Sequence, residues 1–293
     1  MSLEERVLRV SVVITAFNRA DLLEVTLGSL LDEQTFSGFE VIICDDASTD
    51  RTPEVCTHFA HRDARVRVIR NDVNLGMPQN LNRGIAAAQG EYIANLHEDD
   101  AISSNLLAAW MAALDACPNA GFVFNAYDAD VEGRDDPRLF TEDIASCNSG
   151  STILERLFFR RWRFTSPVWG TVMARRSAYE TLGLFDERFG LLADVDMWMR
   201  LSEVGDVAYV REPLIRIASQ ERAPHRFQIT RRRHRRLVQR MFLEARLRHF
   251  RGWKLALELA RHASYIVMDL TYWEMLRMWR LLKQVTAAMR RRD

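Results

Sequence analysis

Three consecutive carboxylates, Glu98, Asp99 and Asp100, follow the apolar run 92–96 in the stretch EYIANLHEDDAIS. Neighbouring carboxylates repel one another, and burial at the end of a strand increases the repulsion. A hard divalent cation with oxygen ligands would relieve it and could also bind a substrate's phosphates. The plainer interpretation is that Asp100 and Ser103 precede a helix, where acidic residues favour the macrodipole.

Three further stretches combine polar residue types that could bind a ligand or move a proton. In CDDASTDRTP (44–53), two aspartates end a strand, either as turn and N-cap residues or as acceptors for a ligand's base or ribose. TAFNR (15–19) offers an aromatic ring and a cation for a nucleobase and its phosphates. In ADVDMWMRL (193–201), Asp194 is either a helix N-cap or a general base facing an acceptor hydroxyl.

Alternating strand-like and helix-like segments must position these residues. We expect strands at 10–17, 39–46, 65–70, 91–96, 121–127, 166–175 and 206–218. We expect helices at 21–34, at 52–62 with Thr52 as N-cap, at 77–90 closed by Gly90, at 103–116, from 152, at 176–183 and from near Asp194. This alternation predicts βαβ units on a mostly parallel sheet, and ligands bind outside the carboxyl ends of such strands.

The order and spacing of these motifs resemble the inverting nucleotide-sugar glycosyltransferases of family two, which have the GT-A fold. The matching segments are SVVITAFNRADLLEVTLGSLLDEQTFSGFEVIICDDASTD, NLGMPQNLNRGIAAAQGEYIANLHEDD and GLFDERFGLLADVDMWMRL. The resemblance covers roughly residues 8 to 220. It implies an α/β GT-A domain, Rossmann-like and flanked by helices.

The resemblance also implies a role for each matching residue. The nucleotide-sugar-binding residues would be Thr15, Ala16, Phe17, Arg19, Asp46, Glu98 and Asp99. Asp46 would accept a hydrogen bond from uracil, Asp99 would lie near the ribose or the metal, and Asp100 would bind a Mn²⁺ or Mg²⁺ that bridges the diphosphate. Asp194 would be the catalytic base. It takes the proton of the acceptor hydroxyl while that oxygen displaces the nucleoside diphosphate with inversion.

The sequence departs from the family pattern at three places. Ala193 precedes Asp194 where many relatives have Glu, and Leu81 precedes Asn82 where many have Arg. Gln220 stands near a position that is often His, and His225 is either a surface residue or a contact for the metal or diphosphate. We place the acceptor-choosing residues in 128–170 and around Trp198.

The amino-acid composition bounds the size of the fold and the compartment of the protein. The 293 residues, 48% hydrophobic, suffice for one large domain with an appendage. The four widely spaced cysteines show no CxxC pair, so we expect neither a disulfide framework nor a zinc site. We therefore expect the protein to work in a reducing compartment. Since there is no apolar leader and no run of about 18 apolar residues, we expect a cytoplasmic protein, with peripheral attachment to the inner membrane face as an option.

The last 63 residues differ sharply in charge from the rest. Residues 231–293 hold 17 Lys and Arg against 5 Asp and Glu, and the remainder holds 23 against 35. Basic amphipathic helices with Trp253, Trp273 and Trp279 would lie on an anionic membrane. Alternatively, they pack on the protein's own acidic body or form a homodimer. Nucleic acid is not favoured, because no nucleic-acid module is recognisable.

We therefore predict a GT-A catalytic domain over 1–225 and a basic α-helical region over 226–293. The function is transfer of a sugar from a nucleotide diphosphate, expected to be UDP, to a surface glycan or its lipid carrier. A non-catalytic nucleotide-sugar-binding scaffold would keep the same fold without needing both Asp100 and Asp194. A nucleotidyltransferase would need a Gly-rich triphosphate loop, and TAFNRAD is not one.

Overall fold

The computed structural model describes residues 8–129, 143–158, 168, 170–217, 231–264 and 266–267. The chain forms two compact units, Met1–Ile229 and Thr230–Asp293. The domain boundary that we predict between residues 225 and 226 lies outside the described residues.

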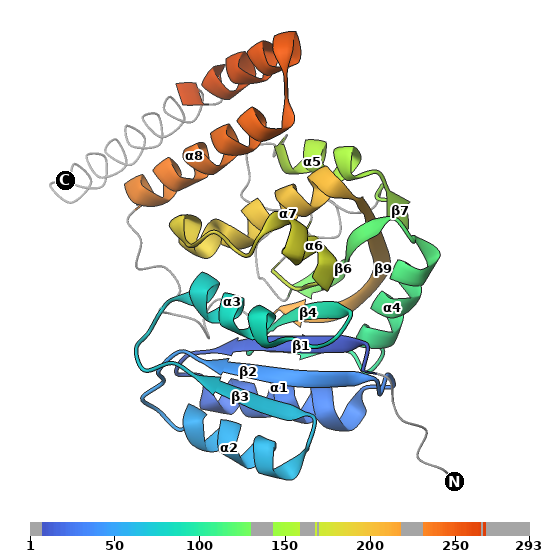
Figure 1. The fold of residues 1–293 in the computed structure, drawn as a ribbon, viewed down its shortest axis with the longest axis vertical. Helices are drawn as coiled ribbons and strands as arrows, with labels where there is room; N and C mark the ends of the chain where they lie inside the picture. Colours follow the sequence, from blue (N-terminus) through green and yellow to red (C-terminus); the bar gives the residue numbers. More distant parts are fainter. Residues whose placement is uncertain are drawn as a thin grey trace, which may run out of the picture. The chain divides into compact units, whose positions relative to one another are not determined.

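The first half of the central sheet is parallel. It contains β1 (Val10–Ala16), β2 (Phe39–Asp45), β3 (Val66–Arg70) and β4 (Tyr92–His97), in the order β3-β2-β1-β4. The connecting helices are α1 (Ala20–Glu33), α2 (Thr52–Arg62) and α3 (Met77–Ala87) (Figure 1). Parallel pairing brings the carboxyl ends of all four strands to one edge, where the predicted site residues follow.

Helices cover both faces of these strands, which explains the nearly continuous apolar sequence of β1 and β2. Val10, Val12 and Ile14 belong to the core shared with α1, α2 and α4 (Leu106–Ala116). Successive side chains of a strand point to opposite faces, so Val13 points the other way. There it meets α3, where Gly84 lies so close to Val13 and Cys44 that an added Cβ would clash.

The second half of the sheet is mixed. It contains β5 (Asp100–Ile102), β6 (Ala120–Ala129), β8 (Val172–Arg175) and β9 (Asp206–Ile217), and the full order is β3-β2-β1-β4-β8-β6-β9-β5. A two-residue strand, β7 (Cys147–Asn148), pairs with β9. Only β6 and β9 are parallel here; β8 runs antiparallel to both neighbours. The prediction of a mostly parallel sheet therefore holds for the first half alone.

Four further helices complete the first unit as described. They are α5 (Gly150–Phe158), α6 (Arg176–Leu182), the 3₁₀ helix η2 (Glu187–Leu192) and α7 (Ala193–Val204). Trp198 of α7 is fully buried and its ring packs with Phe122 and Phe185, so its own side chain is a core residue. That residues around Trp198 choose the acceptor stays a prediction.

Two predicted helix ends are wrong. Helix α2 has Arg51 as its N-cap, because the Thr52 hydroxyl accepts a hydrogen bond from Arg19 N instead of capping the helix. Helix α3 ends at Ala87, three residues before Gly90. Gly90 lies against the backbone of β1, where an added Cβ would be 2.7 Å from Ser11 N. Glycine at this position lets its backbone lie close to that of β1, and it does not terminate the helix.

The cysteines are used in two ways. Cys117 and Cys147, 30 residues apart, form a disulfide, so the expectation that the cysteines stay unpaired is wrong for this pair. The tertiary fold brings them together, since the end of α4 and the start of β7 meet there. Cys44 and Cys56 are free and buried, and burial is the main cause that raises the pKa of each thiol to about 12.

The second unit, over its described part, is a pair of helices. Helix α8 (Arg231–His249) is followed by a helix over 252–264. Gly252 has φ +57° at the turn between them, a left-handed conformation that favours glycine. Among the described residues, none of the helices has the length and apolar character needed to cross a membrane. Trp273 and Trp279 lie outside the described residues.

Candidate active site

The acidic triplet forms a turn between β4 and β5 that is held from behind by α1. The Thr26 hydroxyl donates to the carbonyl oxygens of Glu98 at 2.9 Å and Asp100 at 3.2 Å. Asp100 is 5% exposed and begins β5, and its Oδ2 accepts from the backbone N–H of His97 at 3.3 Å. Glu98 and Asp99 are half-buried. Glu98 and Asp99 are thus the more accessible members of the triplet.

Helix α4 does not explain the triplet. It begins at Leu106 after the N-cap Asn105, and its first turn contains no acidic residue. The interpretation of Asp100 as a helix-start residue is therefore wrong. A macrodipole acts mainly within the first turn of its helix, so it offers these carboxylates little compensation.

Asp46, at the end of β2, is almost fully engaged by the fold. It is 4% exposed, and its Oδ1 accepts from Asn71 Nδ2 at 2.8 Å and from Leu75 N at 2.7 Å. Its Oδ2 accepts from Gly76 N at 2.9 Å. A carboxylate has about four acceptor positions, so three are occupied and one position on Oδ2 is left for a ligand. Asp46 holds the loop that leads into α3.

The loop 15–19 presents one aromatic ring to solvent. Phe17 is 43% exposed, Thr15 and Arg19 are half-buried, and Ala16 is buried. Asn18, which the sequence analysis missed, has φ +54°, and its Oδ1 accepts from Thr49 N at 2.8 Å. Asparagine tolerates this left-handed conformation, which is the signal that could have identified it. Asn18 ties the loops after β1 and β2 together.

Asp50 strengthens the same connection. Its carboxylate accepts from Ala20 N at 3.3 Å and Thr52 N at 2.9 Å. Burial raises the pKa of Asp50, but hydrogen bonds from the side chain and backbone of Thr52 and from Ala20 outweigh it, so the pKa lies below its ordinary value. The charged form is the one that holds the two loops.

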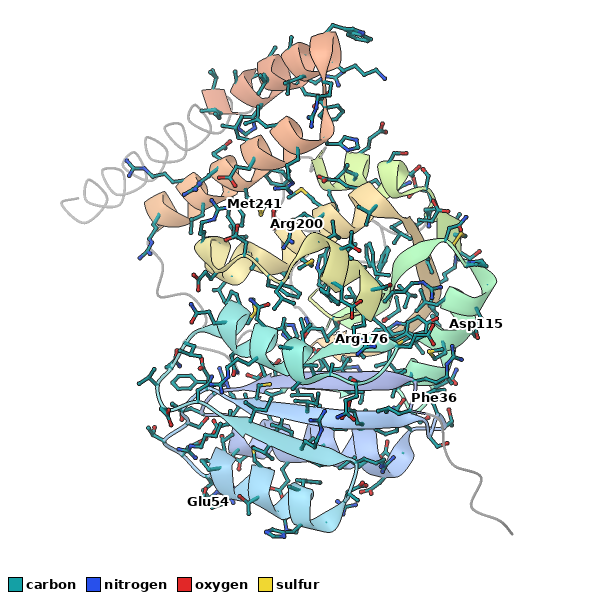
Figure 2. All side chains as sticks on the ribbon, viewed as in Figure 1. Phe36, Glu54, Asp115, Arg176, Arg200 and Met241 are labelled. Carbon is teal, nitrogen blue, oxygen red and sulfur yellow. A yellow bond between two sulfur atoms is a disulfide. The ribbon has the colours of Figure 1, made fainter. Side chains whose placement is uncertain are left out.

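Asp194 and Asp196 lie on the first turn of α7 and have different environments. The N-cap of α7 is Leu192, so the N-cap interpretation of Asp194 is wrong. Asp194 is half-buried, and its Oδ1 accepts from Val195 N at 2.7 Å. Asp196 is 1% exposed and pairs with Arg200 at 2.8 Å. Arg200, labelled in Figure 2, also donates to the carbonyl oxygens of Leu182 and Leu184. Asp196 therefore serves the fold.

Gly170 lies where the end of β4, directly before the acidic turn, meets Asp194. Asn95 of β4 donates through Nδ2 to Gly170 O at 2.9 Å. A Cβ added at Gly170 would lie 2.5 Å from His97 Nε2 and 3.7 Å from Asp194 Oδ2. The imidazole of His97 and the carboxylate of Asp194 thus flank the same glycine. Neither Asn95, His97 nor Gly170 was singled out from the sequence, where nothing marks their proximity.

A cleft of about 550 Å³ opens between the loop that Asp46 holds and η2. Its lining residues are Leu75, Gly76, Met77, Pro78, Gln79, Glu187, Arg188, Gly190 and Leu191. Asn82 of α3 fixes the two walls, since it donates to Phe185 O at 2.8 Å and accepts from Phe185 N at 2.9 Å. Helix α7, with Asp194, begins directly after the η2 wall. The volume falls in the range of small-molecule sites.

Glu98 and Asp99 fit a hard cation by their chemistry, because they offer oxygen ligands at partial exposure. They do not form a complete ligand set by themselves. Among the residues that the structure describes, the three-residue group with metal-ligand spacing is Cys117, Cys147 and Asp206, two of which are disulfide-bonded. A cation at the acidic turn would need ligands from a substrate. Gln220 and His225 lie outside the described residues.

The parallel half-sheet, the strand-end acids and the aspartate on α7 define a GT-A-type transferase fold. The family model described as "Glycosyl transferase family 2" matches residues 11–183, and the chain belongs to that family. It is 27% identical over 225 residues to "Putative glycosyltransferase EpsE" of Bacillus subtilis (strain 168), covering 71% of this chain and 72% of that protein. In other curated relatives the match is shorter, 32% or 14% of their length.

Two solved structures share the fold at low sequence identity. The structure of S. aureus TarS 1–349 in complex with UDP-GlcNAc has a TM-score of 0.69 and 19% identity, and the match covers 88% of this chain and 73% of that one. The mannosyltransferase PcManGT from Pyrobaculum calidifontis, with GDP-Man and Mn²⁺, has a TM-score of 0.57 and 20% identity over 88% of this chain and 69% of that one.

Proposed function

We propose that the protein transfers a sugar from a nucleoside diphosphate donor to an acceptor hydroxyl with inversion at the anomeric carbon. The observation that carries this is that Asp194 and His97, the residue directly before the acidic turn, flank the same glycine, Gly170. Asp194 takes the proton of the acceptor hydroxyl as its oxygen attacks the anomeric carbon. The nucleoside diphosphate leaves from the opposite face of the sugar.

The donor's diphosphate is proposed to lie at Glu98 and Asp99, with Mn²⁺ or Mg²⁺ between them. When bound, the cation neutralises charge on the departing diphosphate. We favour Asp99 over Asp100 as its principal ligand, because Asp100 is buried and engaged with the backbone N–H of His97. Asp100 then acts on the geometry of the turn, which revises the role that the resemblance implies.

Thr15, Ala16, Phe17 and Arg19 are proposed to receive the nucleoside, with Phe17 stacking on the base. Uracil is the base we favour, and the remaining acceptor position of Asp46 Oδ2 suits the N–H of that base. The acceptor is proposed to be a glycan or a lipid-linked glycan in cell-surface polysaccharide synthesis. It would approach through the cleft beside η2. Helix α7, which carries Asp194, follows η2 directly in the chain.

Calorimetric titration of UDP, GDP and dTDP, with and without Mn²⁺, tests the donor site. We expect metal-dependent binding of UDP that Asp99→Asn abolishes and Asp100→Asn weakens. Asp115→Asn, an exposed change on α4 labelled in Figure 2, is the matched control and should bind as the wild type does. Absence of binding for all three nucleotides would contradict the donor site.

A non-catalytic scaffold that binds nucleotide sugars is the second candidate, since it would keep the same fold and donor site. Hydrolysis of UDP-sugar in the absence of acceptor, or transfer to a glycan acceptor, separates the two. Nucleotide binding that is Mn²⁺-dependent, with neither hydrolysis nor transfer in the wild type, would favour the scaffold.

A further inference from the structure

The turn between the two helices of the second unit exposes apolar side chains. We call residues 247–257 the hairpin tip. Trp253 is 73% exposed, Leu247 is 46% exposed and Leu257 is 44% exposed. Trp253 and Leu257 are four residues apart on one helix, so they share a face. These side chains give the tip an exposed apolar surface within its own unit.

Cations surround these apolar groups. Residues 245–257, ARLRHFRGWKLAL, contain no Asp or Glu. Arg251 and Lys254 are exposed on either side of Trp253. The tip therefore combines aromatic and aliphatic side chains with positive charge, and its own sequence includes no carboxylate side chain.

Buried ion pairs hold the hairpin in a defined shape. Arg246 of α8 is 2% exposed and lies 3.5 Å from Glu258 of the second helix, which is 4% exposed. Arg261 pairs with the other oxygen of Glu258. Arg251 Nη1 donates to the carbonyl oxygens of Leu247 and Arg248 at 2.8 Å, which caps the end of α8. These ion pairs and hydrogen bonds thus fix the conformation of the turn that carries the tip.

We propose that the hairpin tip docks on the surface of an anionic lipid bilayer, with Trp253 at the level of the headgroups. Tryptophan prefers the interface of a bilayer, and lysine and arginine beside it bind anionic headgroups. A second copy of the chain fits the tip less well, because the core of a stable protein interface is depleted of charge and buries about 800 Å² per partner. Here cations alternate with three apolar side chains.

Co-sedimentation of the full chain with vesicles tests the proposal. Vesicles of phosphatidylcholine with phosphatidylglycerol should bind the wild type, and vesicles of phosphatidylcholine alone should bind it weakly. Arg251→Glu/Lys254→Glu should lower the partition coefficient by roughly tenfold or more, and Trp253→Ser by several-fold. Binding should weaken as salt is raised.

Matched variants in the first unit keep the result interpretable. Arg62→Glu/Arg176→Glu makes the same change in net charge at exposed sites, and Val25→Ser removes an apolar side chain that is 68% exposed. Both should bind vesicles as the wild type does, and calorimetric nucleotide binding should be unchanged in all variants. Vesicle binding by the tip variants equal to that of the wild type would overturn the proposal. So would a dimer that Trp253→Ser dissociates, or binding to DNA but not to vesicles.

Discussion

At the end of β2, Asp45 and Asp46 are almost completely buried and accept hydrogen bonds from the protein itself. Asp45 binds Ser48 N at 3.0 Å and pairs with Arg70 at 3.3 Å. At the end of β4, two strands away in the sheet, Glu98 and Asp99 are half-buried. The two acid pairs have similar chemistry and equivalent places on parallel strands.

The difference lies in which groups the surrounding backbone offers. The loop 74–76 turns its N–H groups toward Asp46, while the turn after β4 receives Thr26 on its carbonyl oxygens instead. Asp46 accepts three hydrogen bonds, so most of its acceptor positions serve the fold. Glu98 and Asp99 lie in a turn that is braced through its backbone carbonyl oxygens, and they are more exposed than Asp46.

The largest effect is expected for Asp194→Asn, which removes the proposed base without removing a core contact. The transfer rate should fall by about 10²- to 10⁴-fold, because general base catalysis typically contributes that much. Steady-state kinetics measure the loss, and nucleotide binding and the free energy of unfolding should be nearly unchanged. Transfer at the wild-type rate would assign the base to another residue.

Substitutions in the two acid pairs should change the free energy of unfolding by different amounts. Asp46→Ala should lower the free energy of unfolding by about 3 kcal/mol, because it leaves buried donors unsatisfied. Asp99→Ala should change it by less than about 1 kcal/mol. Urea denaturation measures both. Equal losses in the two variants would contradict the distinction between the buried acid pair and the half-buried one.

Gly170→Ala tests the contact that joins the end of β4 to Asp194. The added Cβ would meet the ring of His97, so the ring or the backbone must shift. We expect kcat to fall by roughly tenfold with little change in the donor's KM, since small misplacements of reacting groups cost rate. Gly28→Ala on α1, where an added Cβ meets nothing within 4 Å, is the control. A kcat equal to that of the wild type would show that the packing at Gly170 does not affect the reaction rate.

The smallest effect concerns pH. The folded pKa of Asp50 is below its ordinary value of 3.8, so its ionised form stabilises the fold above that pH. This stabilisation is lost as the pH falls through the folded pKa. Asp50→Asn should therefore flatten the acid side of the stability curve, measured by urea denaturation between about pH 3 and pH 5. An unchanged slope would show that Asp50 does not hold the two loops by charge.

The elements of the first half were predictable because each carries a local signal. The β-branched run at 10–16 and the helical spacing at 20–33 depend on neighbours in sequence. The strand differs from the prediction by one residue at its end, and the helix by one residue at each end. The strand-end positions of Asp46 and Asp99 followed from the same alternation. The family match rests on these segments as well.

Contacts between distant segments were not predictable in this way. Asp100 is buried, Asp46 accepts three hydrogen bonds, Cys117 pairs with Cys147, and His97 meets Gly170. Each of these features joins groups whose proximity no local pattern encodes. The sequence by itself determined which strands and helices form and which carboxylates stand at their ends. Only the tertiary structure decided which of those carboxylates the backbone occupies, because hydrogen-bond donors reach them from loops far away in the chain.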